Sequence, residues 1–266
     1  MKKDILDYFG NSHASHIHAR GKLSTNKLSE LLKPQENEKI LEVGFGTGAT
    51  LIQNASQSKA EFFGYDMSPI MHQKALKRIK FCGMTDRISL SLLEKKNHFP
   101  AENNTFVKVY AESIIAIQEA EDFKNLFLEI KRVLKPNGVL LFNETIWLDT
   151  TSKKTAENIN EQCKKAFGII QANHEYAHLR DWKKILIELD FKHELEIQVD
   201  EIVSESVRTT RPMFRSNIFT LLGKLKLFLS PSMRRNKKKF QTEMNSIINS
   251  EEKLMEGVII KVSNHK

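Results

Sequence analysis

The sequence of 266 residues has almost no cysteine and no long apolar run. Its two cysteines, Cys82 and Cys163, lie far apart and form no C-x-x-C or other metal-ligand spacing, so we expect core or surface residues and no metal site. No apolar stretch approaches the ~18 residues of a membrane-spanning helix. The first residues also lack the apolar core of a signal peptide. We therefore expect a soluble, cytoplasmic protein with one large domain, or one domain with an insertion.

Acidic residues are scarce in one segment, residues 203–240, where Glu205 is the single acid. This segment holds ten basic residues and carries a charge of +9, whereas the formal net charge of the whole chain is +8. The remainder of the chain therefore carries −1, and the basic character belongs to one segment rather than to the fold. The ten residues are Arg208, Arg211, Arg215, Lys224, Lys226, Arg234, Arg235, Lys237, Lys238 and Lys239.

Glycine is concentrated at one informative place, residues 39–48, with the sequence Lys-Ile-Leu-Glu-Val-Gly-Phe-Gly-Thr-Gly. The apolar start predicts a buried parallel strand. Three alternating glycines, Gly44, Gly46 and Gly48, let the backbone turn sharply and approach a ligand that a Cβ would block. A helical pattern begins at Ala49. Strand, glycine loop and helix in this order predict a nucleotide-type pocket, with backbone N–H groups of the helix N-terminus facing the ligand.

An acid stands at the expected distance beyond this loop. Asp66 follows Gly48 by eighteen residues and ends a second apolar run, residues 62–65. An acid at the tip of the second strand of such a unit can accept hydrogen bonds from both ribose hydroxyls. The glycine loop alone is a weak signal, and the combination of the loop with this acid is a much stronger one.

Two cofactors fit the loop. The pattern Gly44-x-Gly46-x-x-Ala49 fits the dinucleotide fingerprint, which would indicate an NAD-dependent oxidoreductase. The pattern Glu42-x-Gly44-x-Gly46-x-Gly48 resembles motif I of the class I S-adenosylmethionine-dependent methyltransferases. We favour the second, because a carboxylate at position 42 suits the ammonium and sulfonium charges of S-adenosylmethionine and would repel a pyrophosphate.

The resemblance to this superfamily, and to its small-molecule type 11 members, continues along the chain. The family places a Pro-x-x-(Asp/Asn)-x-(Ser/Thr)-Phe turn before its fourth strand, and residues 100–106 read Pro-Ala-Glu-Asn-Asn-Thr-Phe. It places a Leu-x-Pro-x-Gly turn before its fifth strand, and residues 134–138 read Leu-Lys-Pro-Asn-Gly. The match is specific over residues 39–147 and weaker to residue 203.

The resemblance implies an α/β fold with a doubly wound, seven-stranded, mostly parallel sheet whose last strand is antiparallel. On this basis we expect a helical cap at residues 1–38, the methyltransferase core at 39–204, a helical lid at 205–253 and the final core strand at 254–266. It also implies a methyltransferase that uses S-adenosylmethionine and acts on a small-molecule acceptor. We expect a hydrophobic or amphiphilic acceptor and favour O-methylation; a non-catalytic, cofactor-binding or membrane-docking module is the alternative. The oligomeric state stays open.

The expected cofactor residues come from the family pattern. Two of them depart from it, since the family usually has an Asp rather than Glu94 after strand three, and a small or polar residue rather than Glu112 after strand four. Glu112 could contact the methionine end of the cofactor or serve as a solvated helix cap. The full expected set is Glu42, Gly44, Phe45, Gly46, Thr47, Gly48, Asp66, Met67, Glu94 and Glu112.

The sequence does not identify the catalytic base. Glu144 after the fifth strand and the histidines His174 and His178 are weak candidates, because they could lie near the strand ends and a histidine titrates near neutral pH. Any single one of them is more often a loop or surface residue than a base. Three further histidines at positions 13, 16 and 18 could face the pocket, but no carboxylate pattern accompanies them as it would in a metal site.

The basic segment also predicts an amphipathic helix. Pro231 ends that helix, and the run 234–239 and a second helix follow. The apolar face could pack against the sheet edge while the lysines are merely solvated. We expect residues 205–253 to cover the mouth of the substrate pocket, with part of this apolar face lining it and selecting a hydrophobic or amphiphilic acceptor. Alternatively, residues 208–239 could meet an anionic membrane surface. We expect no nucleic acid, because no aromatic residues are interleaved with the charges. The apolar residues at helical spacing are Phe214, Ile218, Leu221, Leu222, Leu225, Phe228 and Leu229.

Overall fold

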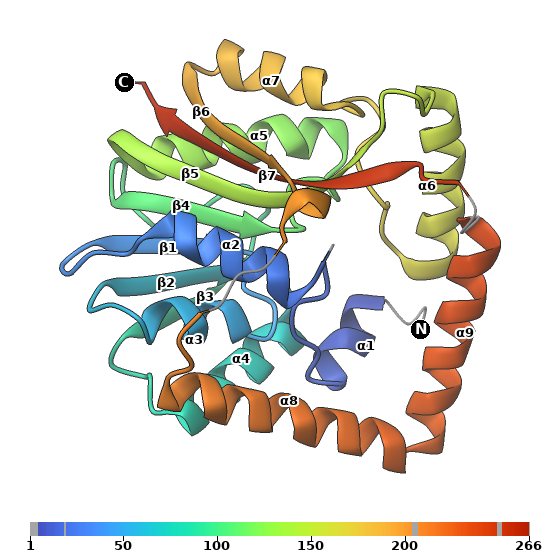
Figure 1. Cartoon of the computed structure of the whole chain (residues 1–266), viewed down its shortest axis with the longest axis horizontal. Coiled ribbons are helices and arrows are strands. Elements are labelled where there is room, and N and C mark those ends of the chain that lie inside the picture. Colours follow the sequence, from blue (N-terminus) through green and yellow to red (C-terminus); the bar gives the residue numbers. More distant parts are fainter. Residues whose placement is uncertain (1–4, 19, 204–206, 249–251, 266) are drawn as a thin grey trace.

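A seven-stranded sheet forms the centre of the molecule (Figure 1). The computed structural model describes residues 5–18, 20–203, 207–248 and 252–265. The strand order is β3-β2-β1-β4-β5-β7-β6; β7 is antiparallel to β5 and β6, and the other paired strands run parallel. This arrangement confirms the predicted fold class. The strands are β1 Lys39–Val43, β2 Glu61–Asp66, β3 Ile88–Leu92, β4 Phe106–Glu112, β5 Leu134–Trp147, β6 Phe191–Gln198 and β7 Met255–Asn264.

Helices cover both faces of the sheet. Apolar side chains of α2, α3 and α4 form one core with the sheet, and those of α5, α6 and α7 form the other. A short 3₁₀ turn, Val199–Glu201, follows β6. The helices are α1 Ile5–Asn11, α2 Lys22–Leu32, α3 Ala49–Ala55, α4 Pro69–Cys82, α5 Ala120–Val133, α6 Lys153–Phe167, α7 Leu179–Glu188, α8 Arg211–Leu229 and α9 Pro231–Ile247.

Local residue types determine where the α4 helix begins and ends. Ser68 precedes the first turn, and its hydroxyl accepts a hydrogen bond from the backbone N–H of Met71 at 3.2 Å. Pro69 occupies the first turn, where its missing N–H costs nothing. Gly83 ends the helix in a left-handed conformation with φ +69°. The residue types at these three positions therefore account for both ends of the helix.

One predicted turn is part of a strand instead. Residues 135–138 were expected to separate α5 from the fifth strand, but β5 already begins at Leu134. The pairing of β5 with β4 shifts register there, because Phe106 pairs with Leu134 and Lys108 pairs with Val139. This shift in register places the Pro-Asn-Gly sequence in an unpaired part of β5, where proline and glycine are tolerated.

The basic segment forms two helices at the surface, α8 and α9, as predicted (Figure 1). The α8 helix packs against α3 and α4, and α9 runs from the end of α8 to α6 and also contacts α1. The expectation that the apolar face of α8 lines a pocket is wrong, since Leu221 is 63% exposed and Leu225 is 51% exposed. The division of the chain into cap, core and lid stays a prediction.

Candidate functional site

Four carboxyl side chains lie at the carboxyl ends of neighbouring strands. Asp66 ends β2, Glu42 lies near the end of β1, Glu112 ends β4, and Glu144 in β5 lies one residue beyond the residue that pairs with Glu112. The strand order reverses between β1 and β4, and open parallel sheets bind their ligands at such a point. Each of the four residues was a sequence candidate, and the structure brings them to one edge of the sheet.

The glycine loop joins β1 to α3 at this edge. Gly44 has φ +73° and Gly46 has φ +50°, backbone conformations that residues other than glycine rarely adopt. A Cβ on Gly44 would lie 2.0 Å from Cγ1 of Ile114, so the loop is closely packed there. At Gly46, by contrast, no atom of the described residues other than its chain neighbours lies within 4 Å of the Cβ position. The loop therefore leaves room for a ligand beside Gly46.

Asp66 is held directly against this loop. Its Oδ2 accepts a hydrogen bond from the backbone N–H of Gly46 at 2.9 Å, and its Oδ1 accepts one from the N–H of Ser68 at 2.8 Å. Burial raises the pKa of Asp66 to about 6, although these backbone donors oppose the shift. The acid of β2 and the glycine loop of β1 thus form one unit.

The remaining expected cofactor residues are arranged around the loop in different ways. The ring of Phe45 is buried in the core, and Thr47 donates a hydrogen bond from its hydroxyl to the carbonyl of Ala14 at 2.6 Å. Met67 is 41% exposed just after Asp66. Glu94 is exposed beyond the end of β3. The assignment of these side chains to a cofactor stays a prediction.

The side chain of Glu42 is buried beside the neighbouring strand β4 and does not reach the surface. Its Oε2 accepts a hydrogen bond from the hydroxyl of Tyr110 at 2.9 Å. Burial, together with the nearby charge of Glu112, raises the pKa of Glu42 well above its usual range. Glu42 is thus suited to a hydrogen-bonding role beneath the loop.

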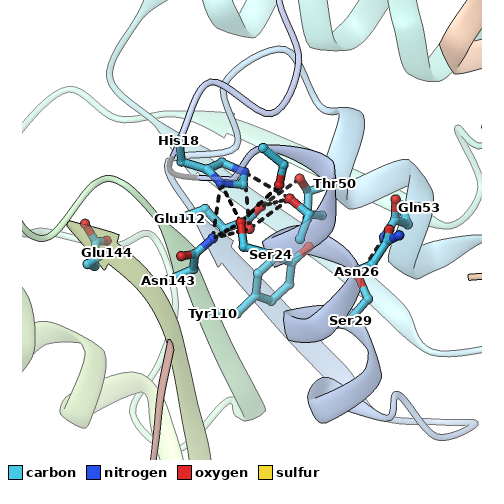
Figure 2. A network of polar contacts seen from close by, with 12 residues as sticks. His18, Ser24, Asn26, Ser29, Thr50, Gln53, Tyr110, Glu112, Asn143 and Glu144 are labelled. Atoms are coloured by element: carbon cyan, nitrogen blue, oxygen red, sulfur yellow. Dashed lines mark hydrogen bonds and ion pairs between the residues drawn. The ribbon is translucent and has the colours of Figure 1, made fainter. Parts of the chain in front are cut away.

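Glu112 is the centre of a dense network of polar contacts (Figure 2). Its carboxylate accepts hydrogen bonds from the hydroxyls of Thr25 at 3.0 Å and Thr50 at 2.9 Å, and from the amide of Asn143 at 3.2 Å. Burial by itself raises the pKa of Glu112, but His18 and the other donors outweigh it and bring the pKa to about 2. Its side chain is only 6% exposed, so the solvated-cap interpretation is wrong.

Two histidines reach this network from the N-terminal strap, which we define as residues 12–18 and 20–21 between α1 and α2. Nε2 of His18 lies 3.4 Å from Glu112, and its Nδ1 lies 3.1 Å from the amide of Asn143. The ring of His16 lies beside it, with ring centroids 6.3 Å apart. Nε2 of His16 is buried and has no hydrogen-bond partner in the described part of the chain. Burial lowers the pKa of His16 to about 4, so its ring is neutral at physiological pH.

Glu144 faces the opposite side of the sheet and holds a loop. Its carboxylate accepts hydrogen bonds from the backbone N–H groups of Ile114 at 3.0 Å, Ile115 at 2.9 Å and Ala116 at 3.1 Å. Burial raises the pKa of Glu144 to about 7 despite these donors. These bonds fix the segment that follows β4, and thereby the packing of Ile114 against Gly44.

The two other candidate bases contact different elements. His178 is the N-cap of α7, and its Nε2 lies 2.9 Å from the carbonyl of Thr151. Nδ1 of His174 lies 3.3 Å from the amide of Asn160 in α6, and His174 borders a shallow hollow beside that helix. None of these contacts reaches the glycine loop. In the part of the chain that is described, no group of three or more His, Cys, Asp or Glu side chains could hold a metal ion.

Comparison with known sequences identifies related proteins. The family model described as "Methyltransferase domain" matches residues 40–138. The "Methyltransferase GfsG" of Streptomyces halstedii is 26% identical over 193 residues, which cover 72% of this chain and 65% of that protein. The "24-methylenesterol C-methyltransferase 3" of Arabidopsis thaliana is 30% identical over 121 residues, which cover 46% of this chain and 32% of that protein. The aligned regions thus span less than two thirds of these relatives.

Solved structures share the fold over nearly the whole chain. A phosphoethanolamine N-methyltransferase 2 of Haemonchus contortus in complex with S-adenosyl-L-methionine has a TM-score of 0.68 and 16% identity, and the match covers 98% of this chain and 57% of that one. The geranyl diphosphate C-methyltransferase of Streptomyces coelicolor, solved with S-adenosyl-L-homocysteine, has a TM-score of 0.61 and 12% identity, with 92% and 76% covered. At such identities the likeness shows the fold alone.

Proposed function

Because the chain belongs to the class I S-adenosylmethionine-dependent methyltransferase superfamily, we propose that it transfers a methyl group from S-adenosylmethionine to a small organic acceptor. The observation that carries the proposal is the hydrogen bond between Asp66 and Gly46. It joins an acid suited to ribose hydroxyls to a glycine loop that has room for a ligand. Solved relatives of the same fold hold S-adenosylmethionine or S-adenosylhomocysteine.

The residues at this edge fit the cofactor chemically. The carboxylate of Asp66 accepts two backbone hydrogen bonds and keeps lone pairs for two ribose hydroxyls. Glu112 is ionised and suits the ammonium group, while the backbone N–H groups after Gly46 suit the carboxylate of the methionine part. When bound, the cofactor supplies a methyl group activated by its sulfonium. The protein then has mainly to align an acceptor with that carbon and exclude water.

His16 is our choice for the group that takes the acceptor's proton. The sequence candidates Glu144, His174 and His178 are occupied by other contacts, whereas the buried Nε2 of His16 carries no hydrogen bond among the described residues. We propose that an acceptor hydroxyl donates to this nitrogen. As its oxygen bonds to the methyl carbon and the carbon–sulfur bond breaks, His16 would take the proton, and the negative charge of Glu112 would stabilise the imidazolium.

The acceptor is proposed to be hydrophobic or amphiphilic. Two relatives are named as methyltransferases of lipophilic acceptors, a methylenesterol and geranyl diphosphate, which supports this class. Both are named as C-methyltransferases, so C-methylation is the competing reaction. In that reaction a double bond of the acceptor would attack the methyl group without first losing a proton. His16 would then take a proton only after the carbon–carbon bond has formed, or would not be needed.

Isothermal titration tests the proposal. S-adenosylhomocysteine should bind with one site per chain, and NAD should not bind. Binding of NAD without S-adenosylhomocysteine would instead support an oxidoreductase. Labelled methyl transfer to a panel of phenolic, polyene and isoprenoid acceptors then separates an enzyme from a module that binds the cofactor without turnover.

A further inference from the structure

The α8 helix is attached to the protein by its polar side. The guanidinium of Arg78, in α4, is fully buried and donates hydrogen bonds to the hydroxyls of Ser216 at 3.2 Å and Thr220 at 3.1 Å. It also donates to the carbonyl of His13 in the strap at 3.0 Å. Gly223 lies so close to the strap that a Cβ would come within 2.2 Å of the carbonyl oxygen of Ser12. Small and polar side chains therefore fix which side of α8 faces inward.

The apolar side of α8 consequently faces outward. Its side chains recur at intervals of three and four residues and line one face of the helix. Globular proteins rarely leave so many large apolar side chains together in water, and such patches mark interaction sites. The exposed fractions are 60% for Phe214, 63% for Leu221, 51% for Leu222, 51% for Leu225, 67% for Phe228 and 67% for Leu229.

The patch continues onto the neighbouring helix. Phe81 of α4 is 45% exposed, and its ring centroid lies 6.3 Å from that of Phe219 in α8. We call the combined region the α8 surface: the exposed apolar side chains of α8 together with Phe81.

Cations surround the α8 surface. The α8 helix carries four of them and the start of α9 carries more. Lys74 of α4 lies close enough to Lys226 and to Lys77 for their charges to add to the effect of burial and lower its pKa. Lys239 forms an ion pair with Glu243, with 3.6 Å between Nζ and Oε1. Within the described residues, the other eight cations of α8 and α9 that we count here form no ion pair with a carboxylate. They are Arg211, Arg215, Lys224, Lys226, Arg234, Arg235, Lys237 and Lys238.

We propose that the α8 surface docks on an anionic membrane. The apolar side chains would enter the boundary between headgroups and acyl chains, and the surrounding cations would contact anionic headgroups. A second copy of the chain fits less well, because a symmetric pair would bring two sets of unpaired cations together. No described helix is long and apolar enough to span a membrane, so the contact is peripheral. The inference goes beyond methyl transfer, and the test below needs no turnover.

Vesicle sedimentation tests this inference with the full chain. The protein should pellet with vesicles of phosphatidylcholine containing about 30 mol% phosphatidylglycerol, and at least about tenfold less with phosphatidylcholine alone. Binding should fall steeply as salt is raised. The double variants L221Q/L225Q and K224E/K226E should each lower the partition coefficient by about tenfold or more. The matched charge control is K124E/K192E, which changes exposed lysines of α5 and β6 on other elements; it should bind like the parent.

Three results would overturn the inference. The first is absence of binding to anionic vesicles, and the second is equal binding by the parent and both α8 variants. The third is a dimer in analytical ultracentrifugation that L221Q/L225Q dissociates, since a second copy would then cover the surface. The substituted leucines are exposed, so thermal unfolding of the variants should match that of the parent.

Discussion

At the carboxyl ends of the strands, charged side chains are buried and meet donors, whereas on α8 apolar side chains face water and charges surround them. Glu112 is the clearest case of the first arrangement, with four neighbouring side chains directed at its carboxylate. Leu221 represents the second, at 63% exposed. Burying a charge and exposing a leucine are both unfavourable for stability alone. This contrast is the basis of our two proposals, in which each region meets a ligand of different chemistry.

The N-terminal strap touches both regions. His13 accepts a hydrogen bond from Arg78 and stacks on Phe219 of α8, with ring centroids 4.6 Å apart. Ala14 accepts one from Thr47 in the glycine loop. His18 lies against Glu112 a few residues later. One short segment thus lies between the proposed membrane contact and the proposed reaction centre.

The largest expected effect is the loss of cofactor binding in G46V. Because no described residue beyond its chain neighbours comes within 4 Å of the Cβ position of Gly46, valine would occupy ligand space without displacing the atoms placed there. Titration should show S-adenosylhomocysteine affinity reduced at least about 100-fold, with stability lowered only by the cost of φ +50°, about 1–2 kcal/mol. The contrasting variant is G44A, whose Cβ would meet Ile114 at 2.0 Å; it should lose stability first.

The pH dependence of unfolding sharpens the picture of the buried edge. The folded pKa of Glu112 is about 2, below its unfolded value of 4.5. Its contribution to stability is therefore fully present above pH 4.5 and lost as the pH falls towards 2. Urea unfolding gives the free energy of unfolding of the parent and of E112Q. The difference between the two proteins should shrink by roughly 3 kcal/mol when the pH is lowered from 6 to 2. Parallel curves would mean that Glu112 does not hold its charge in this network.

R78M tests whether the inward face of α8 contributes to stability through its hydrogen bonds to Arg78. The variant leaves two hydroxyls and a carbonyl without their charged donor, which should lower the free energy of unfolding by about 2–3 kcal/mol in urea titration. The strap should also become more susceptible to proteolysis. A stability equal to that of the parent would show that α8 is not held by this side.

D66A should weaken S-adenosylhomocysteine binding by roughly 1.5–3 kcal/mol, the range for losing hydrogen bonds to a charged group. The matched control is D86A, which removes an exposed acid in the loop before β3. Isothermal titration of both variants gives the comparison. If D66A binds like the parent, the ribose is not at β2 and the site assignment fails.

The smallest effect is expected for L222Q. Leu222 is 51% exposed, so its replacement should change the free energy of unfolding by no more than about 0.5 kcal/mol. A loss well above this value, measured in dilute protein without lipid, would show that the outward face of α8 is covered in solution.

The sequence was sufficient for the sheet and for part of the site. Local chemistry determines the glycine loop, the acid at position 66 and the ends of α4, so these could be predicted from short patterns. Periodicity also predicted that α8 has an apolar face, but not which face packs. That choice depends on Arg78, which lies far away in the chain and ties the polar face inward.

The histidines of the strap could not be assigned from the sequence. They lie in an irregular segment where His13 and His16 have positive φ values of 54° and 55°, so no periodic pattern predicts the direction of their side chains. Only the fold brings His18 to Glu112, across 94 residues of chain. The same holds in part for Glu144. The sequence prediction placed it after the fifth strand, whereas it lies within β5, and its three backbone donors could not be predicted.

A crystal structure of the protein with S-adenosylhomocysteine tests the central claim most directly. We expect both ribose hydroxyls to donate hydrogen bonds to Asp66, the homocysteine part to pass Gly46 towards Glu112, and the sulfur to face the side of the pocket where Nε2 of His16 lies. A nucleoside bound away from Asp66, or a sulfur turned away from the strap, would contradict it.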